Sequence, residues 1–371
     1  MFSPRTGKSA KRSPLRTVSF RKEFTLTTVF YIVLAILAFG FMIAIHELGH
    51  FAAARACGVA IHEFSLGMGP RLCGWHGKSG TAYNLRLFPI GGYVSMKGED
   101  EDADGADSFS QKKAWQKFII VAAGALMNIL VAMILCFALS ISDGIGSTVV
   151  HSFYDGALSN EWLEVGDRIV EVGGAKTHIA TEVAYEIMHD GYEPIDIVVV
   201  RDGERITLED VTFGTMTESG VLYGYRDFVM YRAELTVGNL LKHTWYRSIS
   251  TVKMIWESLI DLFIGRVGVE AVSGPVGVTD AMVTAAKSGA SNFFNLLAVL
   301  AMNLGVFNLL PFPALDGGRL VFILYEMIFR RKVPAKVEGA IHTAGMLLLF
   351  ALMIFVVFKE IGRASCRERV S

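Results

Sequence analysis

The chain has 371 residues, of which 52% are hydrophobic and 19% are charged, and its formal net charge is −1. Such a composition is too apolar for an ordinary soluble protein of this length and indicates a multi-pass membrane protein with a soluble part. The near-zero net charge excludes the strongly basic balance that is typical of nucleic-acid binding, so we expect no nucleic-acid partner.

The first apolar segment, Phe24–Ile45, follows a basic stretch and is long enough to cross a bilayer. Basic residues before an apolar run are also typical of signal peptides. However, no convincing cleavage site with small residues follows, and the run continues directly into a charged motif. We therefore predict that this segment remains in the mature protein as a transmembrane helix.

The charged motif is His46-Glu47-Leu48-Gly49-His50. On a helix, His46 and His50 are one turn apart, so both imidazoles project from the same face and can bind one Zn²⁺. Glu47 lies beside that face, where it can take a proton from a water that the metal activates and pass it to a leaving amine. The same pattern occurs by chance on soluble helices. Here the flanks are apolar, and each ionisable group in a membrane costs roughly 2.5–3.5 kcal/mol, which favours a bound metal over chance.

The whole pattern predicts a polytopic α-helical membrane protein with about four transmembrane helices, membrane-associated β-hairpins and one inserted α/β domain. The four apolar segments are Phe24–Ile45, Phe118–Ser142, Ser288–Leu315 and Gly339–Phe358. The predicted parts are a basic N-terminal extension (1–23), helices 1 and 2 with a β region at about 62–98 (24–142), a soluble domain (146–232), an amphipathic juxtamembrane region (238–287), helices 3 and 4 (288–360), and a tail (363–371) that resembles vector-encoded sequence.

The soluble domain begins with a turn, a strand and a second turn over Val165–Gly174. A helix is predicted near Thr181–His189, and strands are predicted at Ile195–Arg201 and Glu204–Leu208. The pattern Leu-x-x-Gly-Asp-Arg-Ile-x-x-Val-x-Gly, which starts at Leu163, resembles the signature of a PDZ domain. PDZ domains bind extended peptides by strand addition. A spacer domain without ligand binding remains an equal alternative, because no peptide-binding loop is recognisable.

Leu240–Phe263 places large apolar residues at steps of three and four, which predicts an amphipathic helix. Such a helix fits the outer membrane surface, and it fits equally well against the PDZ-like domain. The sequence leaves both interpretations open.

A zinc ion held by two histidines needs a third protein ligand and an open position for water. Asp316 is the first charge after the third apolar run, and Pro311 and Pro313 interrupt the helix just before it. An unwound segment at membrane depth is tolerated where it lines a cavity, and Asn308 would then hydrogen-bond the backbone of an extended substrate. Taken alone, Asp316 is better explained as an interfacial residue at a helix end. Its case as a ligand rests on its occurrence together with the histidine motif.

The basic residues indicate the orientation in the membrane. The loop between the first two spans and the loop between the last two are both rich in Lys and Arg, so the positive-inside rule puts both in the cytoplasm. This choice leaves the basic extension 1–23 outside. We interpret the conflict as a tolerated tail or a start codon assigned too early; an inverted topology is the alternative.

Together these motifs resemble the site-2 protease family of intramembrane zinc metalloproteases, and most closely the regulator of sigma-E protease type. The resemblance covers nearly all of residues 24–360. It extends to Gly67-Met68-Gly69-Pro70, Pro89-Ile90-Gly91-Gly92-Tyr93-Val94, Ala123-Gly124-Ala125-Leu126-Met127-Asn128 and Ser273-Gly274-Pro275-Val276-Gly277.

The resemblance implies one Zn²⁺ per chain, the catalytic base Glu47 and a membrane-embedded hairpin at about Phe64–Met96 that helps to present the substrate as a strand. The implied zinc ligands are His46, His50 and Asp316, and the implied substrate-binding residues are Asn308, Pro311 and Pro313. It also implies a bacterial cytoplasmic (inner) membrane protein, with the active site facing the cytoplasm and the PDZ-like domain outside.

The implied substrates are single-span membrane proteins, such as anti-sigma factors, or remnant signal peptides. An upstream site-1 protease would cut first, and membrane lipids surround the enzyme. The chain has a single PDZ-like domain, whereas some members have two, which bears on substrate gating. A membrane adaptor with a vestigial metal site is the alternative function. A zinc-dependent transporter is a weaker one, because transport does not need Glu47.

Overall fold

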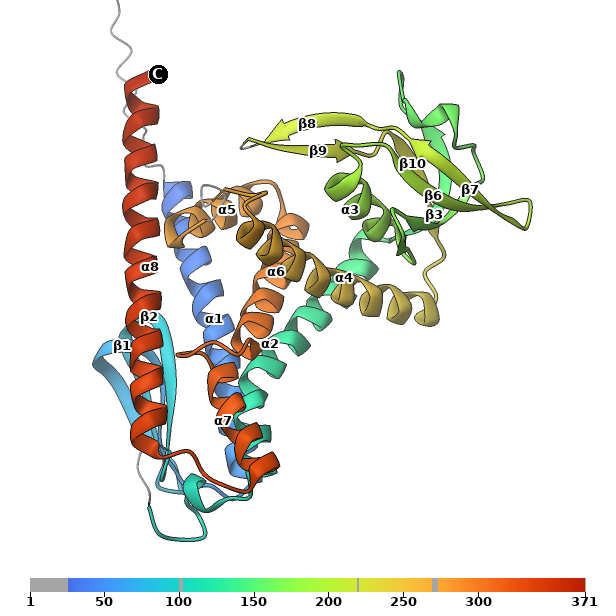
Figure 1. The fold of residues 1–371 in the computed structure, drawn as a ribbon. Coiled ribbons are helices and arrows are strands. Elements are labelled where there is room, and N and C mark those ends of the chain that lie inside the picture. Colours follow the sequence, from blue (N-terminus) through green and yellow to red (C-terminus); the bar gives the residue numbers. More distant parts are fainter. Residues whose placement is uncertain (1–25, 100–102, 219, 269–272, 371) are drawn as a thin grey trace, which may run out of the picture.

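The computed structural model describes residues 26–99, 103–218, 220–268 and 273–370, so the predicted extension 1–23 lies outside the described residues. The helices of the membrane part are α1 (Leu26–Ala56), α2 (Ala114–Asp143), α4 (Val237–Ile264), α5 (Pro275–Lys287), α6 (Ala290–Leu309), α7 (Asp316–Phe329) and α8 (Ala335–Val370). Short 3₁₀ helices occur at Phe109–Gln111 and Ser159–Glu161. Figure 1 shows α1, α2 and α6 gathered in one bundle, with α8 beside it.

Four helices of the described chain are long and apolar enough to cross a membrane. These spans are Val29–Ala56, Ala114–Asp143, Ala290–Leu309 and Lys336–Lys359. The prediction of four apolar spans is therefore confirmed, although the third span ends at Leu309 and not at Leu315. The reason is local, because Pro311 and Pro313 lack backbone N–H groups and disfavour helical conformation in the residues before them.

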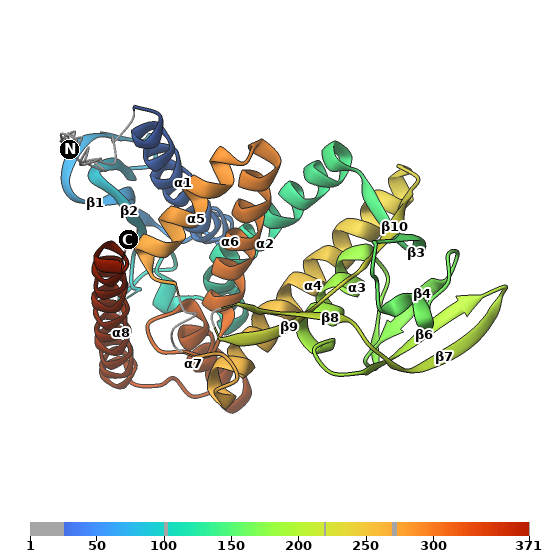
Figure 2. The same cartoon turned by 90° about the horizontal axis from the view of Figure 1, so that it is seen from above.

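The core of the bundle lies where α1, α2 and α6 meet. Its buried residues include Ala35, Met42, Ala132, Ala301 and Met302. Small residues at such contacts let helix backbones approach closely. The van der Waals packing that results helps to drive helix association in lipid. By contrast, α8 exposes most of its apolar side chains, and Figure 2 shows it standing apart from the other spans. A lipid environment explains this exposure.

The β region between the first two spans consists of β1 (Ile61–His76) and β2 (Ala82–Met96), paired antiparallel. Both strands are bent, as their register shows. Leu66 of β1 pairs with both Gly92 and Leu85 of β2, and Leu85 in turn pairs with both Leu66 and Cys73. The bends coincide with glycines at positive φ, among them Gly67 and Gly91, which take a conformation that disfavours other residues. The two long strands therefore form a curved sheet of shorter segments, which packs on the last turns of α1.

The segment between α2 and α4 contains all the other strands of the described residues. They are β3 (Ile145–Phe153), β4 (Arg168–Val172), β5 (Ala175–Lys176), β6 (Ile195–Arg201), β7 (Glu204–Val211), β8 (Gly214–Glu218), β9 (Val221–Tyr225) and β10 (Phe228–Ala233), with helix α3 (Ala180–Asp190) after β5. The main sheet has the order β10-β3-β4-β6-β7 with β5 paired to β4, and β8 and β9 form a separate hairpin. Alternate residues Ile195, Ile197 and Val199 point into a core shared with Val183 and Ile187 of α3.

Asp167, in the Gly-Asp-Arg stretch before β4, connects the start of β4 to the end of the neighbouring strand β6. Its carboxylate is buried and accepts hydrogen bonds from Nε and Nη2 of Arg201, both at 2.7 Å, and from the backbone N–H of Glu164. The hydrogen bonds from the guanidinium to Asp167 raise the pKa of Arg201 further. This paired contact explains why the turn carries an aspartate at this position.

The amphipathic helix α4 packs against the soluble part and against the bundle. The Tyr185 hydroxyl on α3 donates to Glu257 Oε2 on α4 at 2.7 Å, and the Ser250 hydroxyl on α4 donates to Glu182 Oε1 at 3.0 Å. α4 also contacts α2 and α6. Its outer face exposes apolar residues such as Trp256. Of the two interpretations left open by the sequence, packing on the soluble domain is therefore observed.

Candidate metal centre and active site

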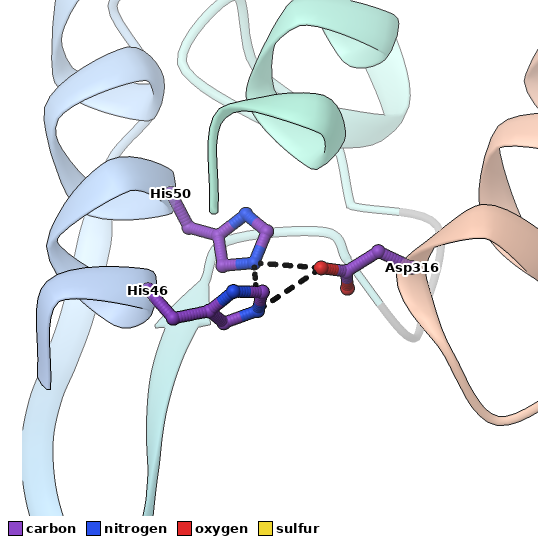
Figure 3. Close-up of side chains that lie close together, drawn as sticks. All are labelled: His46, His50 and Asp316. Carbon is purple, nitrogen blue, oxygen red and sulfur yellow. Dashed lines mark hydrogen bonds and ion pairs between the residues drawn. The ribbon is translucent and has the colours of Figure 1, made fainter. Parts of the chain in front are cut away.

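Three side chains predicted as metal ligands meet at one point. His46 and His50 project from α1, and Asp316 is the first residue of α7 (Figure 3). Asp316 Oδ2 lies 3.1 Å from His46 Nε2 and 3.2 Å from His50 Nε2, and the two Nε2 atoms are 3.2 Å apart. The structure thus brings together a helical pair and a residue from a distant part of the chain.

The chemistry of these atoms fits a metal cation. His50 Nδ1 donates to the backbone carbonyl oxygen of Ile120 at 2.9 Å, so in the neutral ring His50 Nε2 carries a lone pair. Asp316 Oδ2 is buried and, although it is at ion-pair distance from both rings, makes no hydrogen bond of good geometry within the described residues. Lone pairs that converge in this way repel one another unless a cation lies among them. Two imidazoles and one carboxylate with an open fourth position are a common ligand set of catalytic zinc.

A cavity of about 160 Å³ lies beside the three predicted ligands. It is lined by His46, Glu47, His50, Tyr93, Val94, Met96, Glu99, Val121, Asp316 and Arg319. Glu47 therefore shares the cavity with the ligand cluster, as a general base must. The backbone of β2 also comes close, because a Cβ atom at Gly92 would lie only 3.0 Å from Glu47 Cγ. Arg319, one turn along α7 from Asp316, forms an ion pair with Glu99. Both side chains line the cavity.

The close approach of α2 to the histidines depends on two glycines. A Cβ atom at Gly124 of α2 would lie 2.3 Å from His50 Nε2, and one at Gly49 of α1 would lie 2.3 Å from the carbonyl oxygen of Ala123. The segment 123–128 is part of the family resemblance, which by itself implies no role for its residues. A glycine and an asparagine in the middle of an apolar span were the signals that this face of the helix serves the site.

Replacing Gly124 by alanine is expected to weaken zinc binding by roughly 10–100-fold, because overpacking costs about 1–3 kcal/mol and here falls on a ligand. The dissociation constant for zinc can be measured by competition with a chelator in detergent-purified protein. Gly339→Ala is the matched control, since a Cβ atom there meets nothing within 4 Å. Equal zinc affinity in the Gly124 and Gly339 variants would contradict the steric argument.

The segment between α6 and α7 places Asp316. Ala314 has a φ of 80°, and its backbone N–H donates to His342 Nδ1 of α8 at 3.3 Å. A Cβ atom at Gly317 would lie 1.9 Å from the carbonyl oxygen of Leu310, so the first turn of α7 lies directly on the proline-containing loop. The strained backbone, the contact from α8 and the glycine together hold Asp316 toward α1.

The predicted substrate-binding residues lie on or next to this loop. Within the described chain, Asn308, Pro311 and Pro313 do not line the cavity beside Glu47. The Asn308 amide Nδ2 donates to the carbonyl oxygen of Leu304, one turn earlier in α6, at 2.9 Å. The contact of these three residues with substrate stays a prediction.

The fold and the site define a membrane protein with a helical two-histidine motif, a remote aspartate and a partly buried glutamate beside a cavity. The sequence matches peptidase family M50 over residues 34–352. A candidate zinc metalloprotease of Clostridium perfringens is 35% identical over 335 residues, which cover 89% of this chain and 98% of the relative. The regulator of sigma-W protease RasP of Bacillus subtilis is 26% identical over 419 residues, which cover 90% of this chain and 98% of the relative.

The chain belongs to peptidase family M50, the site-2 protease family. It is a zinc metalloprotease of the membrane, which confirms the resemblance, the enzyme class and the cofactor predicted from the sequence.

Proposed function

We propose that this protein cleaves peptide bonds within or near the transmembrane segments of single-span membrane proteins. One Zn²⁺ is held by His46, His50 and Asp316, and Glu47 is the general base. The observation that carries the proposal is that the ligand atoms all lie within 4.8 Å of one another, beside a cavity that Glu47 lines. The histidines lie in the candidate span Val29–Ala56, which supports hydrolysis inside the membrane.

Zinc held by the two histidines and Asp316 would polarise the scissile carbonyl and lower the pKa of a water molecule to near neutral. The Glu47 carboxylate accepts a proton from the attacking water and delivers it to the nitrogen of the leaving amine. The carbonyl of Ile120 keeps the His50 ring oriented with Nε2 toward the site. The cavity of about 160 Å³ beside Glu47 is large enough for the reacting water.

A substrate helix must unwind before its amides become accessible, because its backbone groups are already hydrogen-bonded to one another. Residues with low helix propensity in the substrate should therefore favour cleavage. We propose that the hairpin at 64–96 presents the unwound segment as a strand. Its position supports this role, since Gly92 of β2 lies against Glu47.

The arrangement of the spans supports the predicted orientation. α1 leads into the β1–β2 hairpin and α6 leads into α7 at one end of the bundle, whereas α2 leads into the β3–β10 domain at the other end (Figure 1). The loops that follow α1 and α7 are rich in basic residues, which favours the cytoplasmic side. The active site then faces the cytoplasm of a bacterial inner membrane, and the β domain lies outside.

We propose that residues 146–232 form a PDZ-like domain that controls access of substrates. The six-stranded sheet, helix α3 and the Gly-Asp-Arg turn at Asp167 support this assignment. The name of the Bacillus subtilis relative supports a role in sigma-factor signalling. The proposed substrates are anti-sigma factors already trimmed by a site-1 protease, or remnant signal peptides.

Removal of the metal tests the proposal. Protein reconstituted into lipid vesicles with a single-span substrate should cleave it, stop when a chelator removes zinc, and recover when zinc is restored. Mass spectrometry of the products locates the cut relative to the span, and metal analysis is expected to give one zinc per chain. Cleavage that persists in metal-free protein would overturn the proposed mechanism, and so would folded protein that takes up no zinc.

A further inference from the structure

A histidine that binds a metal through Nε2 carries its proton on Nδ1 and needs an acceptor there. Such an acceptor fixes the tautomer and the orientation of the ring. His50 has one, since the backbone carbonyl oxygen of Ile120 accepts from His50 Nδ1 at 2.9 Å. The corresponding partner of His46 is a side chain whose role the proposed mechanism leaves unassigned.

That side chain is Asn128 of α2. Its amide Nδ2 lies 3.2 Å from His46 Nδ1, and it is only 1% exposed. Its other end, Oδ1, is buried and has no hydrogen-bond partner within the described residues. In this orientation a donor faces the nitrogen that must itself donate when Nε2 binds a metal, and the acceptor is left unused.

A half turn about the Cβ–Cγ bond exchanges the two ends of the amide and hardly changes its shape. Asn128 Oδ1 then accepts from His46 Nδ1–H. The exchange gives the orphaned oxygen the donor that it lacks and leaves the lone pair of His46 on Nε2, 3.1 Å from Asp316 Oδ2.

The position of Asn128 follows from the packing of two antiparallel helices. Ile120, Gly124 and Asn128 are spaced four residues apart and lie on one face of α2. Ile120 is opposite His50, Asn128 is opposite His46, and Gly124 leaves room for both rings. One face of α2 thus supplies a partner to each of the two histidines.

An unpaired buried amide costs about 1–3 kcal/mol, and leucine would pack at this position without that cost. The presence of an asparagine in the middle of a span is explained if its amide orients a metal ligand. We propose that Asn128 is a positioning residue, whose Oδ1 accepts the His46 Nδ1 proton and so prepares His46 Nε2 for zinc. This inference rests on the proposed role of His46 as a ligand.

Two substitutions separate an accepting role from a packing role. Asn128→Leu keeps the branched shape of the side chain but cannot hydrogen-bond, and Asn128→Asp can accept from His46 but cannot donate. In the full-length protein in detergent, competition with a chelator for zinc should show binding weakened by about 10–100-fold in the leucine variant. The aspartate variant should bind zinc within a few-fold of wild type, because a carboxylate is a common partner of a zinc-bound histidine.

Thr244→Val is the matched control, since Thr244 Oγ1 is another buried oxygen without a partner among the residues that the structure describes, and none of the described residues that line the cavity lies on its helix. Its zinc affinity should equal that of wild type. Wild-type affinity in Asn128→Leu would overturn the inference. Equal weakening in the leucine and aspartate variants would also overturn it, because it would mean that the amide donates.

If wild type binds no zinc, the proposed metal site fails first and this inference fails with it. If wild type binds zinc and His46→Ala does not, the proposed metal site holds, and the Asn128 variants then test this inference separately.

Discussion

Replacing Glu47 by glutamine is expected to slow cleavage of a single-span substrate by roughly 10²–10⁴-fold, the usual contribution of a general base. Glutamine has nearly the same size but cannot accept and return a proton. Glu47 lines the cavity beside the ligand cluster and is not one of the three ligands, so the variant should still bind one zinc per chain. Loss of activity with retention of the metal is the signature of a base.

The measurement combines a cleavage assay in vesicles with metal analysis of the same preparation. Asp280→Asn on α5 is the matched control, because it removes an exposed carboxylate in the same part of the protein and should leave both readouts unchanged. A Glu47→Gln variant with undiminished cleavage would remove Glu47 from the mechanism. If neither wild type nor variant cleaves any membrane substrate, the adaptor function gains support.

Replacing Asp316 by alanine is expected to abolish stable zinc binding, and His46→Ala should do the same. Each change removes one of the three proposed protein ligands, and the effect should exceed the roughly 10–100-fold that is typical of residues behind the ligands. Although Asp316 and His46 come from helices at opposite ends of the sequence, their contact at 3.1 Å predicts the same phenotype. A shared loss of zinc would show that the two segments close one site.

Chelator competition on purified protein measures this effect, and thermal unfolding in excess zinc checks that the variants fold. Asp280→Ala is the control for loss of an aspartate. If Asp316→Ala kept wild-type zinc affinity while His46→Ala lost it, Asp316 would be an interfacial residue at the start of α7, as its position taken alone suggested. The third ligand would then have to be sought elsewhere along the cavity.

Membership in peptidase family M50 bears on the two other functions that the sequence left open. A transporter does not require Glu47, whereas the proposed hydrolysis does, and Glu47 lines the cavity together with the three proposed ligands. An adaptor would not need a cavity beside a metal-binding cluster. The metal-removal experiment and the Glu47 variant together separate these functions, because transport and peptide capture both survive the loss of a general base.

Features that depend on neighbours in the chain were predictable from the sequence alone. His46 and His50 lie on one face because a helix repeats every 3.6 residues, and the four spans follow from the length of the apolar segments. The helix and strands after Val165 were also placed close to where they occur, since alternation and turn residues are local signals.

Features that depend on packing were decided only by the tertiary structure. The bends of β1 and β2, the position of α4, the close contact at Gly124 and the orphaned amide of Asn128 all arise where distant segments meet. The spacing of residues in the sequence shows the period of a helix. It does not show which other helix packs against it, because that choice depends on the fit of whole surfaces. The sequence therefore determined the two histidines and the spans, whereas the meeting of Asp316 with them, and of Asn128 with His46, was decided by how α1, α2 and α7 pack.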